Sequence, residues 1–179
     1  MAAFKDTVGN KVLVAFYSRK GHTKQLGEAV CTGLLDARVD VTCQEVEPER
    51  EVNVLSASAS SFTHSCEPIK ECETDLDGVN LLVLGTPLWG GLPAPYMRTF
   101  LEQVRDLKGL PVVLFATCAF GDRHASDDLR DMVRSTGGRP MEYHVWSIRR
   151  EGPHGMERTA EDIVESTLGL LPALKPTFE

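Results

Sequence analysis

The sequence predicts an α/β fold, with a parallel β-sheet between crossover helices, and three observations support this fold class. Strand-like and helix-like segments alternate along the chain, which is typical of successive βαβ units. Two strand-like segments, 12–16 and 80–84, are continuous apolar runs apart from Asn80, as expected for strands covered on both faces. The chain has 179 residues, of which 42% are hydrophobic, and this is enough for a single domain, 1–179, with a sizeable core.

The first elements are predicted from hydrophobic periodicity. Residues 11–17 form the first strand, after which apolar residues recur at helical spacing over 23–36. A second strand is expected at 40–46. The pattern then dissolves over 47–75, which is predicted to be a loop with at most a short helix around 68–74.

Turn-forming residues help to delimit the later elements. Prolines are tolerated at the start of a helix, so Pro93 and Pro95 favour a helix that begins near residue 94. Gly137 and Gly138 end another helix. The predicted strands are 80–84, 111–116 and 141–148, and the predicted helices are 94–104, 126–136 and 156–168. The tail, 172–179, is expected to be loose.

The composition predicts an acidic, cytoplasmic protein. The formal net charge is -7 and the pI is near 5.3, which argues against a general nucleic-acid binder and suits docking to basic partners. No apolar run approaches the roughly twenty residues that span a bilayer, and residues 1–10 lack an apolar stretch of the signal-peptide type. We therefore expect no membrane association, and the oligomeric state stays open.

The five cysteines are predicted to be mostly free, buried thiols, with no metal site. The sequence has no C-x-x-C motif and no histidine at the spacing of a zinc site. Thiols of a cytoplasmic chain are ordinarily reduced. Cys66 and Cys72 lie in a polar segment and could pair or react, so their state is left open.

The segment after the first strand has the composition of a phosphate-binding loop. It offers hydroxyls, cationic side chains and a glycine directly before a helix: Ser18, Arg19, Lys20, Gly21, His22 and Thr23. The first N–H groups of a helix lack partners and carry partial positive charge, so a phosphate is stabilised there. Gly21 lets the backbone approach the ligand closely. The alternative is that Ser18 or Thr23 only caps the helix and that Gly21 eases the turn.

Two further loops are expected beside this one. Ligands of an open α/β sheet bind outside the carboxyl ends of its strands, where the loops at 85–91 and 117–122 each place an aromatic residue among small ones. Neither G-x-x-x-x-G-K-[ST] nor G-x-G-x-x-G occurs in the first loop, so a nucleotide triphosphatase and a dinucleotide site are not supported. The three loops suit a phosphorylated, flat, heteroaromatic ligand.

These loops resemble those of the flavodoxin family, which binds flavin mononucleotide (FMN), and the resemblance covers nearly the whole chain. In that family a [ST]-x-[ST]-G-x-T loop wraps the phosphate, and Ser18, Gly21 and Thr23 match it. Lys20 replaces the middle hydroxyl by a cation, and His22 stands where Asn is frequent. The resemblance implies a flavodoxin-like three-layer α/β/α sandwich with a five-stranded parallel sheet in the order 2-1-3-4-5.

The resemblance also implies which residues hold the FMN. Arg19 is expected to face solvent, and Trp89 to stack on or flank the isoalloxazine ring; the alternative for Trp89 is packing on the following helix as a core residue. The remaining implied contacts come from the two later loops: Thr86, Pro87, Leu88, Trp89, Gly90 and Gly91, with Thr117, Cys118, Ala119, Phe120, Gly121 and Asp122 on the other wall. No catalytic side chain is implied, because the cofactor carries the redox chemistry.

Three functional classes are compared. An electron-transfer flavodoxin, which exchanges electrons with redox partner proteins, is favoured by the acidity of the chain. A NAD(P)H-dependent quinone or flavin reductase would be an oxidoreductase with a cavity for a small acceptor, and the 47–75 segment leaves it open. A cofactor-free signalling module would need an acidic cluster at the strand ends, whereas 18–23 is basic and rich in hydroxyls.

Overall fold

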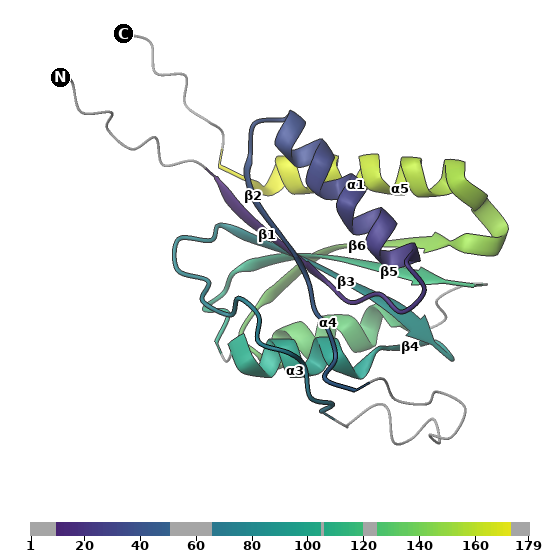
Figure 1. The fold of residues 1–179 in the computed structure, drawn as a ribbon. Coiled ribbons are helices and arrows are strands. Elements are labelled where there is room, and N and C mark those ends of the chain that lie inside the picture. Colours follow the sequence, from purple (N-terminus) through teal and green to yellow (C-terminus); the bar gives the residue numbers. More distant parts are fainter. Residues whose placement is uncertain (1–9, 51–65, 105, 120–124, 173–179) are drawn as a thin grey trace, which may run out of the picture.

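The computed structural model describes residues 10–50, 66–104, 106–119 and 125–172 and contains one twisted sheet (Figure 1). Its five parallel strands are β1 (Lys11–Phe16), β2 (Asp40–Glu45), β3 (Leu81–Trp89), β5 (Pro111–Cys118) and β6 (Arg139–Ser147). They lie in the order β2-β1-β3-β5-β6, which is the predicted 2-1-3-4-5 order of parallel strands. A short sixth strand, β4 (Leu92–Pro93), pairs antiparallel with β3.

Helices cover both faces of the sheet and complete a three-layer sandwich, as predicted (Figure 1). Helices α1 (His22–Asp36) and α5 (Ile148–Leu170) lie on one face, and α3 (Pro95–Val104) and α4 (Ala125–Ser135) on the other. Successive strand side chains point to opposite faces, which is why β1 contributes alternate residues to two separate apolar clusters. None of the helices in the described residues is long and apolar enough to cross a membrane.

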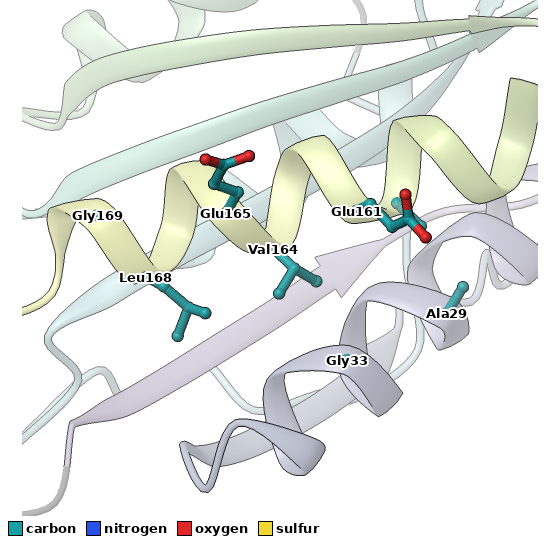
Figure 2. Close-up of a pocket in the computed structure, with 8 residues that line it drawn as sticks. Ala29, Gly33, Glu161, Val164, Glu165, Leu168 and Gly169 are labelled. Atoms are coloured by element: carbon teal, nitrogen blue, oxygen red, sulfur yellow. The ribbon is translucent and has the colours of Figure 1, made fainter.

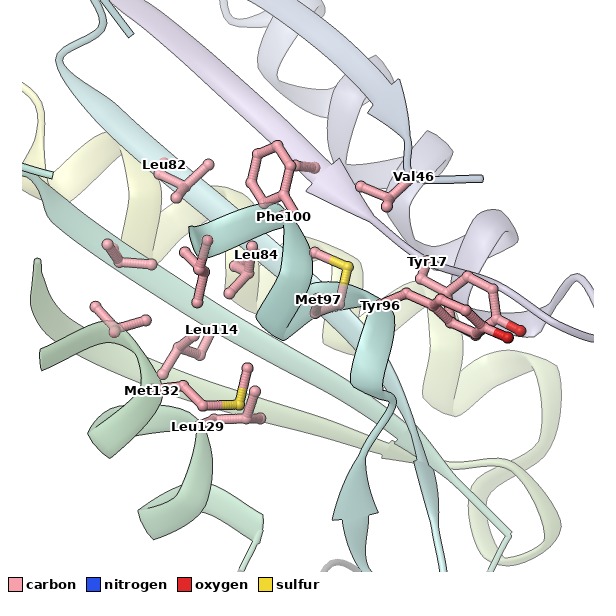
Figure 3. Packing of buried hydrophobic residues seen from close by; sticks show 14 of the residues in the cluster. Tyr17, Val46, Leu82, Leu84, Tyr96, Met97, Phe100, Leu114, Leu129 and Met132 are labelled. Atoms are coloured by element: carbon pink, nitrogen blue, oxygen red, sulfur yellow. The ribbon is translucent and has the colours of Figure 1, made fainter. Parts of the chain in front are cut away.

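The apolar cluster beneath α3 holds the carboxyl end of β1 in place (Figure 3). Met97 and Phe100 of α3 belong to it together with Leu84 of β3, and all three side chains are fully buried. Tyr96 packs against Tyr17, directly after β1, with 4.6 Å between the ring centroids. Burying each such side chain contributes roughly 1.5–3 kcal/mol, so the start of the loop after Tyr17 is firmly anchored.

Several element boundaries differ from those that the sequence predicts. Strand β3 continues to Trp89 instead of ending at Leu84, because Thr86 and Pro87 stay in register with β5 and Leu88 and Trp89 pair with β4. No helix occurs in the described part of 66–74, where an isolated bridge joins Pro48 to Ile69 instead. Residues 51–65 of the predicted loop lie outside the described residues.

Helix α5 begins earlier than the predicted residue 156. It starts at Ile148, directly after β6, and is interrupted at Gly152, whose φ of 59° and ψ of -161° are not helical. Pro153 follows and lacks a backbone N–H, so the regular helix resumes after it. The helix predicted from periodicity is therefore only the portion after this break.

The expectation that most cysteines are free thiols is wrong for two of them. Cys31 of α1 and Cys43 of β2 form a disulfide, with 6.2 Å between their Cα atoms. The crossover from β1 through α1 to β2 brings these residues together, which their spacing of 12 positions does not reveal. Cys66, Cys72 and Cys118 are thiols.

Candidate functional site

A cavity of about 710 Å³ opens at the carboxyl ends of β1, β3, β5 and β6. This is the edge where an open parallel sheet binds ligands, next to β1 and β3, between which the strand order reverses. Residues from all four strand ends line it: Arg19, Lys20, His22, Thr23, Pro87, Leu88, Trp89, Thr117, Cys118, Ala119, Ile148 and Arg149. The structure therefore brings the three predicted loops together at one site.

One end of the cavity has the features of an anion site. Gly21 precedes α1 with a φ of 85°, in the left-handed region that favours glycine, and no side chain of the described residues caps the helix there. The first N–H groups of α1 are consequently available to a ligand, with no acidic residue in the first turn to compete. Within the described part of the chain, the buried Oγ atom of Ser18 has no hydrogen-bond partner.

Thr23 and Thr117 join the start of α1 to the end of β5. Their Oγ1 atoms lie 2.7 Å apart, and Thr23 is only 1% exposed. Either hydroxyl can be the donor. A hydroxyl carries one hydrogen and two acceptor positions, so this contact uses one hydrogen and leaves the other for a ligand oxygen.

Trp89 forms an aromatic wall of the cavity. Its ring meets those of Tyr17 and Tyr96 edge-on, with centroid distances of 5.8 Å and 6.2 Å. Both tyrosines are buried, so they fix the position of Trp89 from the core side, whereas part of the Trp89 side chain stays exposed. The guanidinium carbon of Arg19 lies 5.5 Å from the Trp89 centroid, so this exposed residue, expected to face solvent, also covers the indole ring.

Several predicted contact residues do not line the cavity. Thr86 is fully buried; its hydroxyl accepts a hydrogen bond from the Ala94 N–H and donates to the Pro87 carbonyl, both at 3.1 Å. It fixes the turn that positions Trp89. Four further predicted residues are not among those that line the cavity but lie in the loops that border it: Ser18, Gly21, Gly90 and Gly91. Three predicted residues lie outside the described residues: Phe120, Gly121 and Asp122.

Sequence reasoning missed two lining residues, Ile148 and Arg149. They follow β6 directly, and the N–H of Arg149 donates to the carbonyl of Ala119 at 3.3 Å, which joins the loops after β5 and β6. The signal available in the sequence was the adjacency of the last two predicted strands, whose carboxyl ends must share one edge of the sheet. His22 also approaches this region, with its ring centroid 6.0 Å from that of Trp146.

A second depression, of about 620 Å³, lies elsewhere, between α1 and α5 (Figure 2). Figure 2 shows Val164 and Leu168 of α5 pointing toward the side of α1 that carries Ala29 and Gly33. The lining is mostly apolar and comes from the middle of α1 and the second half of α5. It contains neither the strand ends nor the hydroxyl-rich loop, so the cavity at the strand ends is the candidate site.

Comparison with known proteins identifies the fold. No family model matches the chain. Among solved structures it is similar to an FMN-complexed flavoprotein from Lactobacillus acidophilus NCFM, with 20% identity, a TM-score of 0.58 and coverage of 78% of this chain and 94% of that one. Flavodoxin 2 from Bacillus cereus, in its oxidised form, gives 16% identity and a TM-score of 0.58, with coverage of 89% and 99%.

A candidate flavoprotein from Bacteroides eggerthii DSM 20697 gives a TM-score of 0.64 at 20% identity, over 86% of this chain and 97% of that one. The sheet order and the site at its carboxyl edge thus define a doubly wound α/β protein. More particularly, the chain has the flavodoxin-like fold, as its sequence predicted.

Proposed function

We propose that this chain is an FMN-binding flavoprotein that transfers electrons through the bound FMN. The observation that carries the proposal is that one cavity joins the uncapped start of α1 to the Trp89 ring. Its volume of about 710 Å³ falls within the usual range for small-molecule sites, roughly 300–1,000 Å³. The FMN complex of the Lactobacillus acidophilus protein, which is similar in fold, supports the same ligand.

The residues present fit the two ends of FMN. The Oγ of Ser18, without a partner among the described residues, and the first N–H groups of α1 suit the phosphate. Lys20, exposed at the cavity, adds a cation to this end. Trp89 would flank the flat ring system, and the strand end at 117–119 would form the opposite wall.

When bound, FMN supplies the one- and two-electron chemistry, and the protein contributes binding, orientation and shielding from water. The described residues include no group of three or more possible metal ligands, and the proposal assigns no side chain a catalytic role. The formal net charge of -7 supports a carrier that docks on basic partner proteins. A NAD(P)H-dependent quinone or flavin reductase is the alternative within the same fold.

The test begins with the absorption spectrum of the purified chain. We expect a yellow protein whose flavin is released on denaturation and has the mass of FMN. A colourless protein that takes up no added FMN would contradict the proposal and favour a cofactor-free module.

Anaerobic mixing with NADPH then separates the two flavoprotein classes. A carrier keeps its flavin colour until a separate NADPH-dependent reductase is added, whereas a reductase is bleached rapidly by NADPH alone. The first result supports electron transfer between proteins; the second overturns it in favour of the reductase.

A further inference from the structure

The disulfide between Cys31 and Cys43 lies outside the candidate flavin site. Cys31 is in the middle of α1 and is 5% exposed, whereas Cys43 is exposed on β2. Their Cα separation of 6.2 Å is within the range that disulfides adopt. The bond therefore ties the helix that begins the anion site to the strand at the end of the sheet order.

The disulfide is open to another molecule. Both cysteines line a surface depression of about 400 Å³, together with Phe16, Lys24, Glu28, Thr32 and Glu45. Thiol–disulfide exchange requires that an incoming thiolate reach one of the two sulfur atoms. Because Cys43 is exposed and Cys31 is buried, an incoming thiolate should approach from the Cys43 side, with Cys31 as the leaving group.

The chain also has an exposed cysteine outside this disulfide. Cys66 is exposed and free; its thiol donates to Oε2 of Glu102 at 2.8 Å. Desolvation, followed by this contact with Glu102, raises the pKa of Cys66 to about 11, which keeps its thiolate fraction small near neutral pH. In a reducing compartment such as the cytoplasm, the disulfides that do form are mostly catalytic or redox-sensing.

We propose that Cys31 and Cys43 form a second redox centre, a reversible disulfide that accepts two electrons from a dithiol partner. One thiolate of the partner attacks Sγ of Cys43 and breaks the bond to Cys31, which leaves as a thiolate and takes up a proton. The partner's second thiol then attacks the partner sulfur in the mixed disulfide and releases Cys43, which is protonated in turn. Two electrons and two protons have passed from the partner dithiol, now a disulfide, to this chain.

Opening the bond has a local structural consequence. Among the described residues, strand β2 has a single neighbour in the sheet, β1, and the disulfide adds a covalent link to α1. Reduction removes this link while leaving the central strands β3 and β5 untouched. Backbone amides in β2 and around Cys31 should therefore exchange faster with deuterium after reduction, with no change in β3 and β5.

The test uses the full chain without denaturant and dithiothreitol as the dithiol probe. Alkylation followed by peptide mass analysis reports the state of each cysteine. We expect the Cys31–Cys43 bond to open in dithiothreitol, to re-form in oxidised glutathione, and to do so repeatedly. Cys66→Ser should leave this cycle unchanged, whereas Cys43→Ser, a change at an exposed position, should abolish it.

Two results would overturn the proposal. A bond that opens only when urea unfolds the chain is a structural crosslink, and a pair that stays as thiols in oxidised glutathione is no redox centre. Both measurements are made on protein with and without added FMN, and the redox state of the two cysteines can be determined without a bound flavin. Failure of the proposed FMN function would consequently leave this test intact.

Discussion

At the scale of single residues, the candidate site depends on a few hydroxyl groups with unusual surroundings. Thr23 and Thr117 share one hydrogen bond between the start of α1 and the end of β5, and Ser18 keeps a buried Oγ atom with no partner in the described part of the chain. A buried hydroxyl without a partner is costly for the protein alone. A ligand oxygen that accepts from it would remove this cost, which is why such groups mark binding sites.

Thr23→Ala removes a hydroxyl at the start of α1 that faces the proposed phosphate. We expect FMN binding to weaken by about 1–3 kcal/mol, the usual value for a hydrogen bond to a charged group. Titration with FMN, followed by quenching of its fluorescence, measures the affinity. Thr32→Ala is the matched control, because Thr32 lies on the same helix and its exposed hydroxyl donates only to the Glu28 carbonyl. Unchanged affinity in Thr23→Ala would remove Thr23 from the site.

Ser18→Ala should weaken FMN binding without lowering the stability of the flavin-free protein. Since its buried Oγ has no partner among the described residues and is costly while unpaired, its loss should leave the free energy of unfolding of the flavin-free protein unchanged or raise it. The same change should weaken FMN binding measurably. Urea unfolding and FMN titration of one preparation give both quantities. Lower stability with unaltered FMN affinity would show that Ser18 is structural.

His144 on β6 should make stability depend on pH. Desolvation lowers the pKa of His144 below its usual 6.5, against the opposing effects of Asp162 and Glu142. Below about pH 6.5 His144 binds a proton in the unfolded chain, whereas its lower pKa keeps it neutral in the folded chain. The free energy of unfolding therefore falls as the pH falls. The free energy of unfolding stops falling once the pH lies below the pKa of His144 in the folded chain.

Urea unfolding between about pH 7 and pH 5 measures this dependence. His144→Gln should flatten the curve in this window. Equal slopes for the wild type and His144→Gln would contradict the assignment.

At the scale of elements, the sequence predicts strands and helices well where one hydrophobic pattern dominates. The continuous apolar run of β1 and the helical spacing in α1 predict these elements to within one residue at each end. Strand β3 is longer than predicted because its last residues pair with β4 and β5, contacts that local composition does not encode. Prediction fails similarly at the start of α5, where the helix is interrupted by Gly152 and Pro153.

Close packing between β3 and β5 gives a prediction for Gly85. A Cβ atom there would lie 2.0 Å from Cζ of Phe115, in the buried core. Gly85→Ala should therefore lower the free energy of unfolding by about 1–3 kcal/mol or more. Gly169→Ala in α5 is the control, since no atom of the described residues beyond its chain neighbours and its own helix backbone lies within 4 Å of the added Cβ, and alanine favours a helix. Urea unfolding should show a loss for the first variant and none for the second; equal stabilities would refute the packing argument.

At the scale of the whole molecule, the alternation of strands and helices predicts a parallel sheet and the edge that carries the site, whereas the sheet order was implied by the resemblance to the flavodoxin family. Ten of the lining residues were predicted from three loops, because parallel strands bring their carboxyl ends to one edge. The Cys31–Cys43 bond and the contact of Arg149 with Ala119 could not be predicted, since both depend on the distances between elements. Spacing along the chain does not encode those distances.

The central claim is that the start of α1 holds a phosphate while the cavity beside Trp89 holds the attached ring. Comparing FMN with riboflavin, which lacks the phosphate, tests both parts in one calorimetric titration of the flavin-free protein. We expect FMN to bind and riboflavin to bind at least about tenfold more weakly, a difference of about 1.4 kcal/mol or more. Equal affinities for the two flavins, or binding of neither, would contradict the account.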